Sequence, residues 1–468
     1  MKKKVVVIGA GMGGLTAALR LAQNGFQVRV VEARAIVGGL VSGESFDGFA
    51  FDAGAYILLD RPGLEWAFAS VGLKLGEHIE LCAIDHTYSV AFPNGPNVNI
   101  YSSDVKTARE LEHRRPGTEE LYLQFVRRTG AIESSLRPLL YGSAPGPVSL
   151  LGGGRWRHAA FLMRSLQSVL RASKLPQPVL DALSIWTHVA GQRLEEAPSP
   201  LAFVPALVHS VGCFYPKGGI RTIPEALGRA TVAAGVEFSY MTKVKEICNE
   251  SGRVTGVKIA SGEEIPADAV VSDCGIATYL ELLKDNESAS RKRCETLPLQ
   301  SPGVCAYLAV RGKMEPPYLR FMLPGGEERC RLLILPGVLN PEEKHGEWYP
   351  ARLLGPMEHV KAQRMGQQAQ AEYLEMLLQE KWWQKGIDEY RVLARRTPVK
   401  WGAEYSLARD SMNPVMTAKF MREGRLAHRS PDLRGLYLAG SATHPGQWVS
   451  FCAISGILAA DCLRKDFA

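Results

Sequence analysis

The first 32 residues contain four closely spaced glycines, Gly9, Gly11, Gly13 and Gly14, between two apolar segments. Residues 4–9 are apolar and β-branched, which predicts a buried strand of a parallel sheet. Residues 13–24 place Leu and Ala on one helical face, and residues 27–32 predict a second strand that ends at Glu32. A strand, a glycine turn, a helix and a strand ending in an acid form the βαβ unit that binds dinucleotides. The chain is therefore expected to begin with a Rossmann-like sheet.

The glycines match the spacing G-x-G-x-x-G at Gly9, Gly11 and Gly14. Gly9 permits the tight turn, Gly11 lets backbone approach a diphosphate, and Gly14 allows close helix–strand packing. The diphosphate is expected at the N-terminus of helix 13–24, where free N–H groups and the helix dipole favour anions. Glu32 is expected to accept a hydrogen bond from a ribose hydroxyl. This motif alone does not separate FAD from NAD.

Two further features favour FAD. Gly38 and Gly39 follow the fingerprint directly, where a chain would pass close to a diphosphate and ribityl group. Near the other end, strand 435–439 leads through a glycine loop into a helix that begins near Val449. The N-terminus of that helix can stabilise negative charge on a reduced flavin. Since no second dinucleotide-binding motif occurs, we expect one FAD that contacts both the N-terminal and the C-terminal part of the chain, and no NAD(P)H domain.

The 468 residues exceed the usual size of one hydrophobic core, so two domains are expected. Between the nucleotide-type segments lie a strand pair at 87–92 and 98–101, a mostly helical stretch from 103 to 211, and a second mixed region. The predicted fold is α/β, with a Rossmann-like FAD-binding domain interleaved with an α+β substrate domain. The predicted FAD-binding parts are 1–80, 214–285 and 425–468, and the predicted substrate-domain parts are 81–213 and 286–424.

Charge and cysteine usage exclude several classes. The chain has 55 Lys and Arg against 48 Asp and Glu, a net charge of +7, without a compact basic block, so no nucleic-acid partner is predicted. Nine cysteines occur without any C-x-x-C pair, which predicts reduced thiols, no metal site and a cytoplasmic location.

Residues 155–174 mix cationic and apolar side chains at near-helical spacing. A helix of this kind can lie on an anionic bilayer and admit a lipid-like substrate, which would place the protein peripherally on the inner face of the membrane. The alternative is a buried helix with a solvated basic side. The cations concerned are Arg155, Arg157, Arg164, Arg171 and Lys174.

In the segment from Val5 to Glu32 and at Gly38-Gly39, the chain resembles the phytoene desaturase group of FAD oxidoreductases, within the amine oxidase and protoporphyrinogen oxidase class. The resemblance also includes Phe51 to Gly54, Tyr215 to Gly219 and Leu436 to Gly446. Its most specific piece is Thr443 to Gly446, because amine oxidases usually carry an acid in that loop. The resemblance implies non-covalent FAD and a long apolar substrate. The FAD contacts that it implies are Gly9, Gly11, Gly14, Glu32, Gly39, Val244, Gly440 and Val449.

The chain departs from the family pattern at two places. Leu40 stands where the family commonly has Arg after the double glycine, and Arg34 is the candidate replacement for that diphosphate-side cation. Trp448 and Phe451 replace small residues after the His-Pro-Gly and should reshape the pocket. His444 is a candidate acid or base, although a loop histidine that fixes local hydrogen bonds is an equally good interpretation. Trp448 is the other weak catalytic candidate.

The expected activity is desaturation, saturation or isomerisation of C–C bonds in an apolar, polyene or isoprenoid-like substrate. One alternative is an amine oxidase-type flavoenzyme that oxidises a C–N bond, for which Trp448 and Phe451 could supply aromatic walls. The other is a non-enzymatic prenyl- or lipid-binding escort protein, against which the intact glycine fingerprint argues. The sequence leaves the substrate, the electron acceptor and the oligomeric state open.

Overall fold

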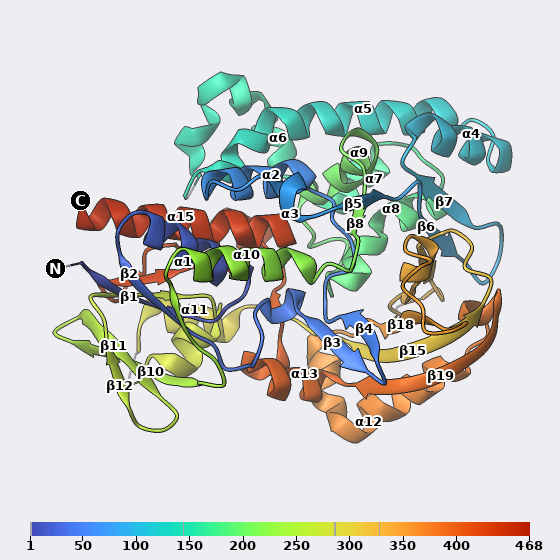
Figure 1. Cartoon of the computed structure of the whole chain (residues 1–468). Helices are drawn as coiled ribbons and strands as arrows, with labels where there is room; N and C mark the ends of the chain where they lie inside the picture. Colours follow the sequence, from blue (N-terminus) through green and yellow to red (C-terminus); the bar gives the residue numbers. More distant parts are fainter. Residues whose placement is uncertain (1, 144, 285–286, 327) are drawn as a thin grey trace.

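The computed structural model describes residues 2–143, 145–284, 287–326 and 328–468. Figure 1 shows a nucleotide-type region with the N- and C-termini on the same side, and a second region built on a large curved sheet. The two termini lie close together: Lys3 Nζ is 5.9 Å from the centre of the Phe467 ring. The tail of the chain therefore returns to its head.

A five-stranded parallel sheet forms the nucleotide-type region, in the order β21-β13-β1-β2-β9. The valines of β1 are buried on both faces of this sheet, which is the pattern of a central parallel strand. The five strands come from three separated stretches of sequence. They are β1 (Lys4–Ile8), β2 (Gln27–Val31), β9 (Glu237–Ser239), β13 (Ala269–Ser272) and β21 (Leu436–Leu438).

Helices α1 (Met12–Gln23) and α15 (Val449–Phe467) pack on this sheet, with α10 (Thr222–Ala233) beside α1 (Figure 1). The approach of α1 and α15 is close because Gly456 has no side chain and faces Gly13 O. Thr16 Oγ1 also donates to Ala453 O at 2.8 Å. A small antiparallel sheet follows β9, with β10 (Val244–Glu250), β11 (Arg253–Ile259) and β12 (Glu264–Pro266).

A seven-stranded mixed sheet organises the second region, in the order β19-β15-β18-β17-β16-β6-β7. Its pairs are antiparallel except β16 with β6, which run parallel. The predicted strand pair at 87–92 and 98–101 is confirmed. The strands are β6 (His86–Ala91), β7 (Val98–Tyr101), β15 (Val304–Gly312), β16 (Leu319–Met322), β17 (Arg331–Ile334), β18 (Tyr349–Gly355) and β19 (Ile387–Arg396).

Strand β18 does not follow from the sequence pattern, because Pro350 argues against an interior strand. The structure shows why the proline is tolerated. β18 pairs with β15 along its whole length, but β17 pairs only with the part from Arg352 to Leu354. Pro350 therefore lies beyond the end of β17, with a neighbouring strand on one side only.

The stretch from 103 to 211 is mainly helical, as predicted, and covers the cavity described below. The remaining short strands form two-stranded pairs: β3 (Gly43–Phe46) with β4 (Phe49–Asp52), β5 (Leu81–Ala83) with β8 (Phe214–Pro216), and β14 (Leu299–Gln300) with β20 (Asn413–Pro414). The other helices are α2 (Arg61–Ser70), α3 (Leu75–His78), α4 (Asp104–Arg114), α5 (Glu119–Leu136), α6 (Ala159–Leu162), α7 (Leu166–Arg171), α8 (Gln177–Val189), α9 (Phe203–Ser210), α11 (Ala289–Thr296), α12 (His359–Gln379), α13 (Pro398–Tyr405) and α14 (Ala418–Glu423).

The expectation of one amphipathic helix over 155–174 is wrong. The chain forms a 3-10 segment, Gly152–His158, and then the short helices α6 and α7. The break within this range lies between α6 and α7, where Ser165 caps the start of α7 by accepting from Ser168 N; Gly153 and Gly154, with positive φ angles of 64° and 69°, lie just before the range. Leu166 and Leu170 belong to the core, being 2% exposed each, so only the first part of the segment presents apolar side chains to solvent.

The α/β fold class, a Rossmann-like sheet interleaved with an α+β region, is confirmed by this topology. The boundaries of the five segments stay a prediction, and β5 and β8 pair across the one between 213 and 214. None of the helices in the described ranges is sufficiently long and apolar to cross a membrane.

Candidate flavin and substrate site

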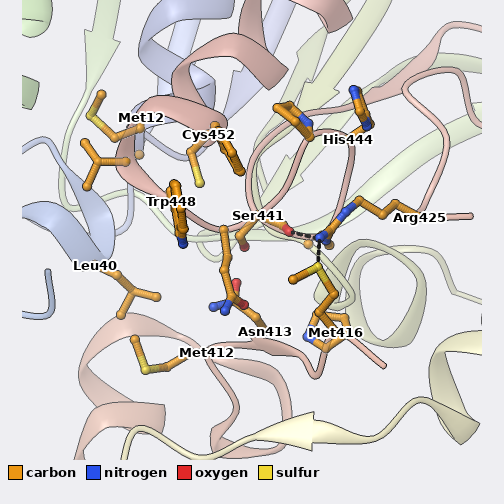
Figure 2. A pocket seen from close by; sticks show the side chains of 18 of the residues that line it. Met12, Leu40, Met412, Asn413, Met416, Arg425, Ser441, His444, Trp448 and Cys452 are labelled. Carbon is orange, nitrogen blue, oxygen red and sulfur yellow. Dashed lines mark hydrogen bonds between the residues drawn. The ribbon is translucent and has the colours of Figure 1, made fainter. Parts of the chain in front are cut away.

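A cavity of about 1200 Å³ runs from the glycine turn into the helical part of the second region. It is larger than the roughly 300–1000 Å³ of ordinary small-molecule sites, which suits a dinucleotide together with a substrate. Figure 2 shows Met12 and Leu40 on one side of this space, Arg425 and His444 on the other, and Trp448 and Ser441 between them. The predicted site residues that line it are Gly9, Gly11, Glu32, Arg34, Gly39, Leu40, Val244, His444, Trp448 and Val449.

Two predicted residues, Gly14 and Gly440, do not line the cavity but allow close packing beside it. A Cβ on Gly14 would overlap Gly9 O, so this glycine lets α1 approach β1. A Cβ on Gly440 would overlap the carboxylate of Asp273. Gly440 also lies against the start of α1, because a Cβ on Gly13 would be 2.6 Å from Gly440 N. The C-terminal loop therefore closes on the glycine turn, as the sequence predicts.

The glycine turn leaves the start of α1 accessible. Gly9 has a φ of 93°, a left-handed conformation that favours glycine, and α1 begins after Gly11 without a side-chain cap. A Cβ on Gly11 would overlap Asp273 Oδ2. Of the N–H groups in the first turn, Gly14 N donates to Asp273 Oδ2 at 2.9 Å, and the N–H groups of a helix start are a suitable site for a diphosphate. The turn fits the anionic middle of a dinucleotide.

Glu32 is buried at the end of β2 and is held by backbone on both sides. Its Oε2 accepts from Ala10 N at 2.7 Å, and its Oε1 accepts from Arg34 N at 2.8 Å. A carboxylate oxygen has two lone pairs, so each oxygen keeps the capacity to accept from a ribose hydroxyl. These bonds fix the acid at the cavity wall, where it can accept from a ribose hydroxyl.

Asp273 was missed as a site residue, although it follows directly after β13. It accepts from Gly14 N at 2.9 Å and faces Gly11, Gly13 and Gly440. Burial raises the pKa of Asp273 to about 7, and the nearby charge of Glu32 adds to this shift. The sequence could have indicated this residue, because Asp273 lies at the carboxyl end of a predicted parallel strand, where α/β sheets bind their ligands.

The double glycine lies against the turn. Gly38 donates to Ala10 O at 2.8 Å, and Gly38 and Gly39 have φ angles of 111° and 52°. A Cβ on Gly39 would be 3.4 Å from Gly11 Cα. Leu40 then presents an aliphatic side chain to the cavity (Figure 2), so this position supplies no cation.

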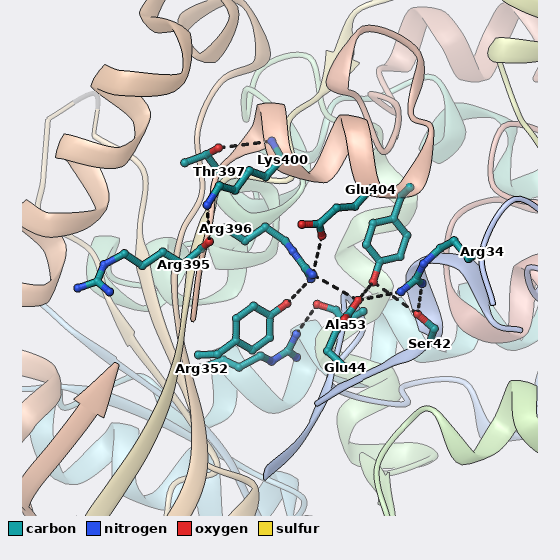
Figure 3. A network of polar contacts seen from close by, with 12 residues as sticks. Arg34, Ser42, Glu44, Ala53, Arg352, Arg395, Arg396, Thr397, Lys400 and Glu404 are labelled. Carbon is teal, nitrogen blue, oxygen red and sulfur yellow. Dashed lines mark hydrogen bonds and ion pairs between the residues drawn. The ribbon is translucent and has the colours of Figure 1, made fainter. Parts of the chain in front are cut away.

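The prediction that Arg34 replaces the missing cation gains no support from its contacts. Its guanidinium pairs with Glu44 at 3.0 Å, donates to Ser42 Oγ at 2.6 Å and lies 4.1 Å from the ring of Tyr405. Glu44 also pairs with Arg396 at the end of β19, at 3.3 Å. Figure 3 shows this network. Arg34 connects the nucleotide-type region to the large sheet, and Glu44 neutralises its charge.

His444 is fixed by the backbone of another segment. Its Nε2 lies 2.9 Å from Leu139 O and must donate there, since a carbonyl only accepts. Burial lowers the pKa of His444 to about 4, so the ring is neutral at physiological pH. This geometry supports the interpretation of a loop histidine that holds the C-terminal loop, over that of an acid or base.

Trp448 lines the cavity just before α15 and stacks on Phe451, with ring centroids 4.8 Å apart and an interplanar angle of 18°. The two rings are in contact and enclose no space between them. They form one aromatic wall at the N-terminus of α15, next to Val449.

The far part of the cavity is apolar. Its walls come from α5, the segment 137–163, α8 and α9, which are distant in sequence from the glycine turn. Sequence patterns could not indicate this lining, because the same residues read as core. Representative side chains are Leu136, Leu139, Leu140, Leu162, Met163, Trp186, Leu201, Phe203 and Leu207.

Comparison with known proteins identifies the family. The model for flavin containing amine oxidoreductases matches residues 12–305. The chain belongs to this flavin-containing amine oxidoreductase family. It is an FAD-dependent oxidoreductase, and the glycine turn, Glu32 and the adjoining cavity fit that cofactor.

Individual relatives and structures agree with the family. The chain is 31% identical over 321 residues to a zeta-carotene-forming phytoene desaturase of Myxococcus xanthus, a match that covers 66% of the chain and 60% of that enzyme. It is 24% identical over 498 residues to a 4,4'-diapolycopene oxygenase of Methylomonas sp, covering 99% and 98%. An oxidoreductase from Methanosarcina mazei has the same fold, with a TM-score of 0.68, 19% identity, and coverage of 98% and 100%.

Proposed function

We propose that this chain desaturates, saturates or isomerises C–C bonds in a long, apolar, unsaturated substrate of the carotenoid type. The observation that carries the proposal is one continuous cavity, with a dinucleotide turn at one end and aliphatic and aromatic walls at the other. The names of the Myxococcus xanthus and Methylomonas relatives, a phytoene desaturase and a diapolycopene oxygenase, support the same substrate class. FAD, when bound, supplies the two-electron acceptor that removal of two hydrogens from a C–C bond requires.

The contribution of the chain itself is binding, orientation and exclusion of water. Apolar walls order a flexible hydrocarbon and keep the reacting carbon atoms dry. Trp448, stacked on Phe451, offers a flat surface for a conjugated chain. Since His444 Nε2 is committed to Leu139 O, we assign no side chain as a base.

The aromatic pair argues against the C–N alternative. An amine held between aromatic walls needs two rings that face each other across a gap. Trp448 and Phe451 instead lie with ring centroids 4.8 Å apart, in direct contact. The escort alternative leaves the intact glycine turn and the fixed Glu32 without a purpose.

We propose also that the surface around residues 148–163 docks on an anionic bilayer and admits the substrate from it. Large apolar side chains are exposed there: Val148 by 78%, Leu151 by 67%, Trp156 by 65% and Met163 by 61%. Arg155 and Arg157 stand among them. Met163 also lines the cavity, so this surface adjoins the apolar end of the site.

Substrate turnover tests the main proposal. The purified protein should show the visible absorption of oxidised flavin. Incubated anaerobically with phytoene in anionic vesicles, it should either bleach that absorption and yield a product with two hydrogens fewer, or yield an isomer without net bleaching; saturation would require flavin that is reduced beforehand. Putrescine serves as the matched amine. Bleaching by putrescine alone would favour C–N oxidation, and a protein that binds no flavin would contradict the proposal.

A further inference from the structure

Arg425 is a cation in the cavity wall that lacks an acidic partner. It lies between α14 and β21, beside the loop that leads into α15. Figure 2 shows its side chain extending toward Ser441, with Met416 close to its end. The guanidinium donates from Nη1 to Ser441 O at 3.5 Å and from Nη2 to Met416 Sδ at 2.9 Å. The first contact is long and the second acceptor is a weak one, so most of its five N–H donors remain available.

Of the three other arginines of the wall, Arg422 is exposed to solvent and the remaining two differ from Arg425 by having acidic partners. Arg34 pairs with Glu44 at 3.0 Å. Arg137 pairs with Asp60 at 2.7 Å and with Glu133 at 2.6 Å. Among the residues that the structure describes, no carboxylate lies within ion-pair distance of Arg425.

The surroundings of Arg425 give it no negative charge. Burial lowers the pKa of His428 and of His444 to about 4, so both rings are neutral. Burial raises the pKa of the Cys452 thiol well above its ordinary value. The ring of Phe420 lies 5.5 Å from the guanidinium carbon. Burial lowers the pKa of Arg425 itself to about 10, which still leaves it charged at neutral pH.

Arg425 is partly buried in the cavity wall, and a cation that faces a cavity without an acidic neighbour attracts an anionic group of the ligand. A guanidinium binds a carboxylate in a bidentate manner. On the basis of the proposed function, we propose that Arg425 binds a carboxylate at the end of the substrate. The substrate is then an amphiphile, a long unsaturated chain that ends in an acid, and the apolar walls hold its chain.

An anionic oxygen could also come from the cofactor, and the experiment separates the two sources. The probes are retinoic acid and its methyl ester, which share the polyene chain and differ in charge. Binding is followed by quenching of tryptophan fluorescence, since Trp186 and Trp448 line the cavity, and this readout does not require bound FAD. The flavin midpoint potential is measured in parallel on the holoenzyme.

We expect the native protein to bind the acid at least tenfold more tightly than the ester. Arg425→Met should remove this preference without weakening ester binding. Arg425→Lys should retain part of the preference, because lysine keeps the positive charge but cannot bind a carboxylate in a bidentate manner. The flavin potential should be unchanged in both variants. Circular dichroism checks that they are folded.

Equal binding of acid and ester by the native protein would overturn the inference. So would an Arg425→Met variant that keeps the preference but has a lower flavin potential, because the anion would then belong to the cofactor. Failure of the proposed function would give a different result: the protein would lack flavin, or would turn over no C–C bond, while it still bound the acid.

Discussion

The two ends of the cavity are built in different ways. At the nucleotide end, polar groups are held by backbone: Glu32 by Ala10 and Arg34, and Asp273 by Gly14. At the apolar end the walls are aliphatic and aromatic, and three buried polar atoms elsewhere in the cavity wall have no hydrogen-bond partner within the described residues: Gln192 Oε1, Gln300 Oε1 and Asn413 Oδ1.

This difference separates a fixed cofactor from a variable substrate. The nucleotide end is preorganised by glycines and short hydrogen bonds, as suits a cofactor of fixed structure. Polar atoms left unsatisfied in a buried wall cost free energy unless a ligand or water meets them. We therefore expect the apolar end to decide which substrate binds.

The largest effect is expected from Gly11→Val. Any side chain here overlaps the carboxylate of Asp273 at the diphosphate position, so the purified variant should contain no FAD. Flavin released from denatured protein, measured per mole of chain, checks this. Gly76→Ala is the control, because a Cβ at Gly76 has open space around it. Full flavin content in Gly11→Val would place the diphosphate elsewhere.

Glu32→Ala should weaken FAD binding by about ten- to a hundredfold. It removes the acceptors of Ala10 N and Arg34 N as well as the ribose contact, and a hydrogen bond to a charged group contributes about 1.5–3 kcal/mol. Titration of apoprotein with FAD, followed by flavin fluorescence, gives the dissociation constant. Glu32→Gln, which keeps one oxygen acceptor, should lose less. Equal losses would mean that the negative charge of Glu32, rather than its acceptors, matters.

The raised pKa of Asp273 predicts that the affinity for FAD depends on pH. Because burial raises its pKa to about 7, the acid is mainly neutral below that pH and ionised above it. An ionised Asp273 repels the diphosphate, so the dissociation constant of FAD should rise above pH 7, by up to about tenfold per pH unit. Asp273→Asn should remove this rise. A variant with the same pH profile as the native protein would assign the dependence to another group.

The smallest effect concerns the membrane surface at the apolar end. Trp156→Ser should reduce flotation with anionic vesicles by about three- to tenfold, since inserting part of an exposed aromatic contributes on the order of 1 kcal/mol. FAD content should not change. Val232→Ser, at an apolar position on α10 that is 57% exposed, is the control. Equal losses in both variants would contradict docking through this surface.

Local sequence patterns determined the nucleotide end. The valines of β1 predict a buried strand, and the spacing of Gly9, Gly11 and Gly14 predicts the turn, because both depend on neighbours in sequence. The glycine loop and helix near Val449 predict the return of the tail for the same reason. These features act through backbone conformation, which a short window of sequence specifies.

Only the tertiary structure decided how charged residues are partnered. Arg34 pairs with Glu44, ten residues away, but is stacked on Tyr405 from the other half of the chain. Asp273 is a site residue because β13 lies beside β1, and Arg425 lacks a partner because no acid of the described residues folds near it. Pairing across hundreds of residues depends on long-range packing, which neither composition nor periodicity contains. The sequence therefore predicted the nucleotide end of the cavity, and long-range packing alone brought together the residues of the substrate end.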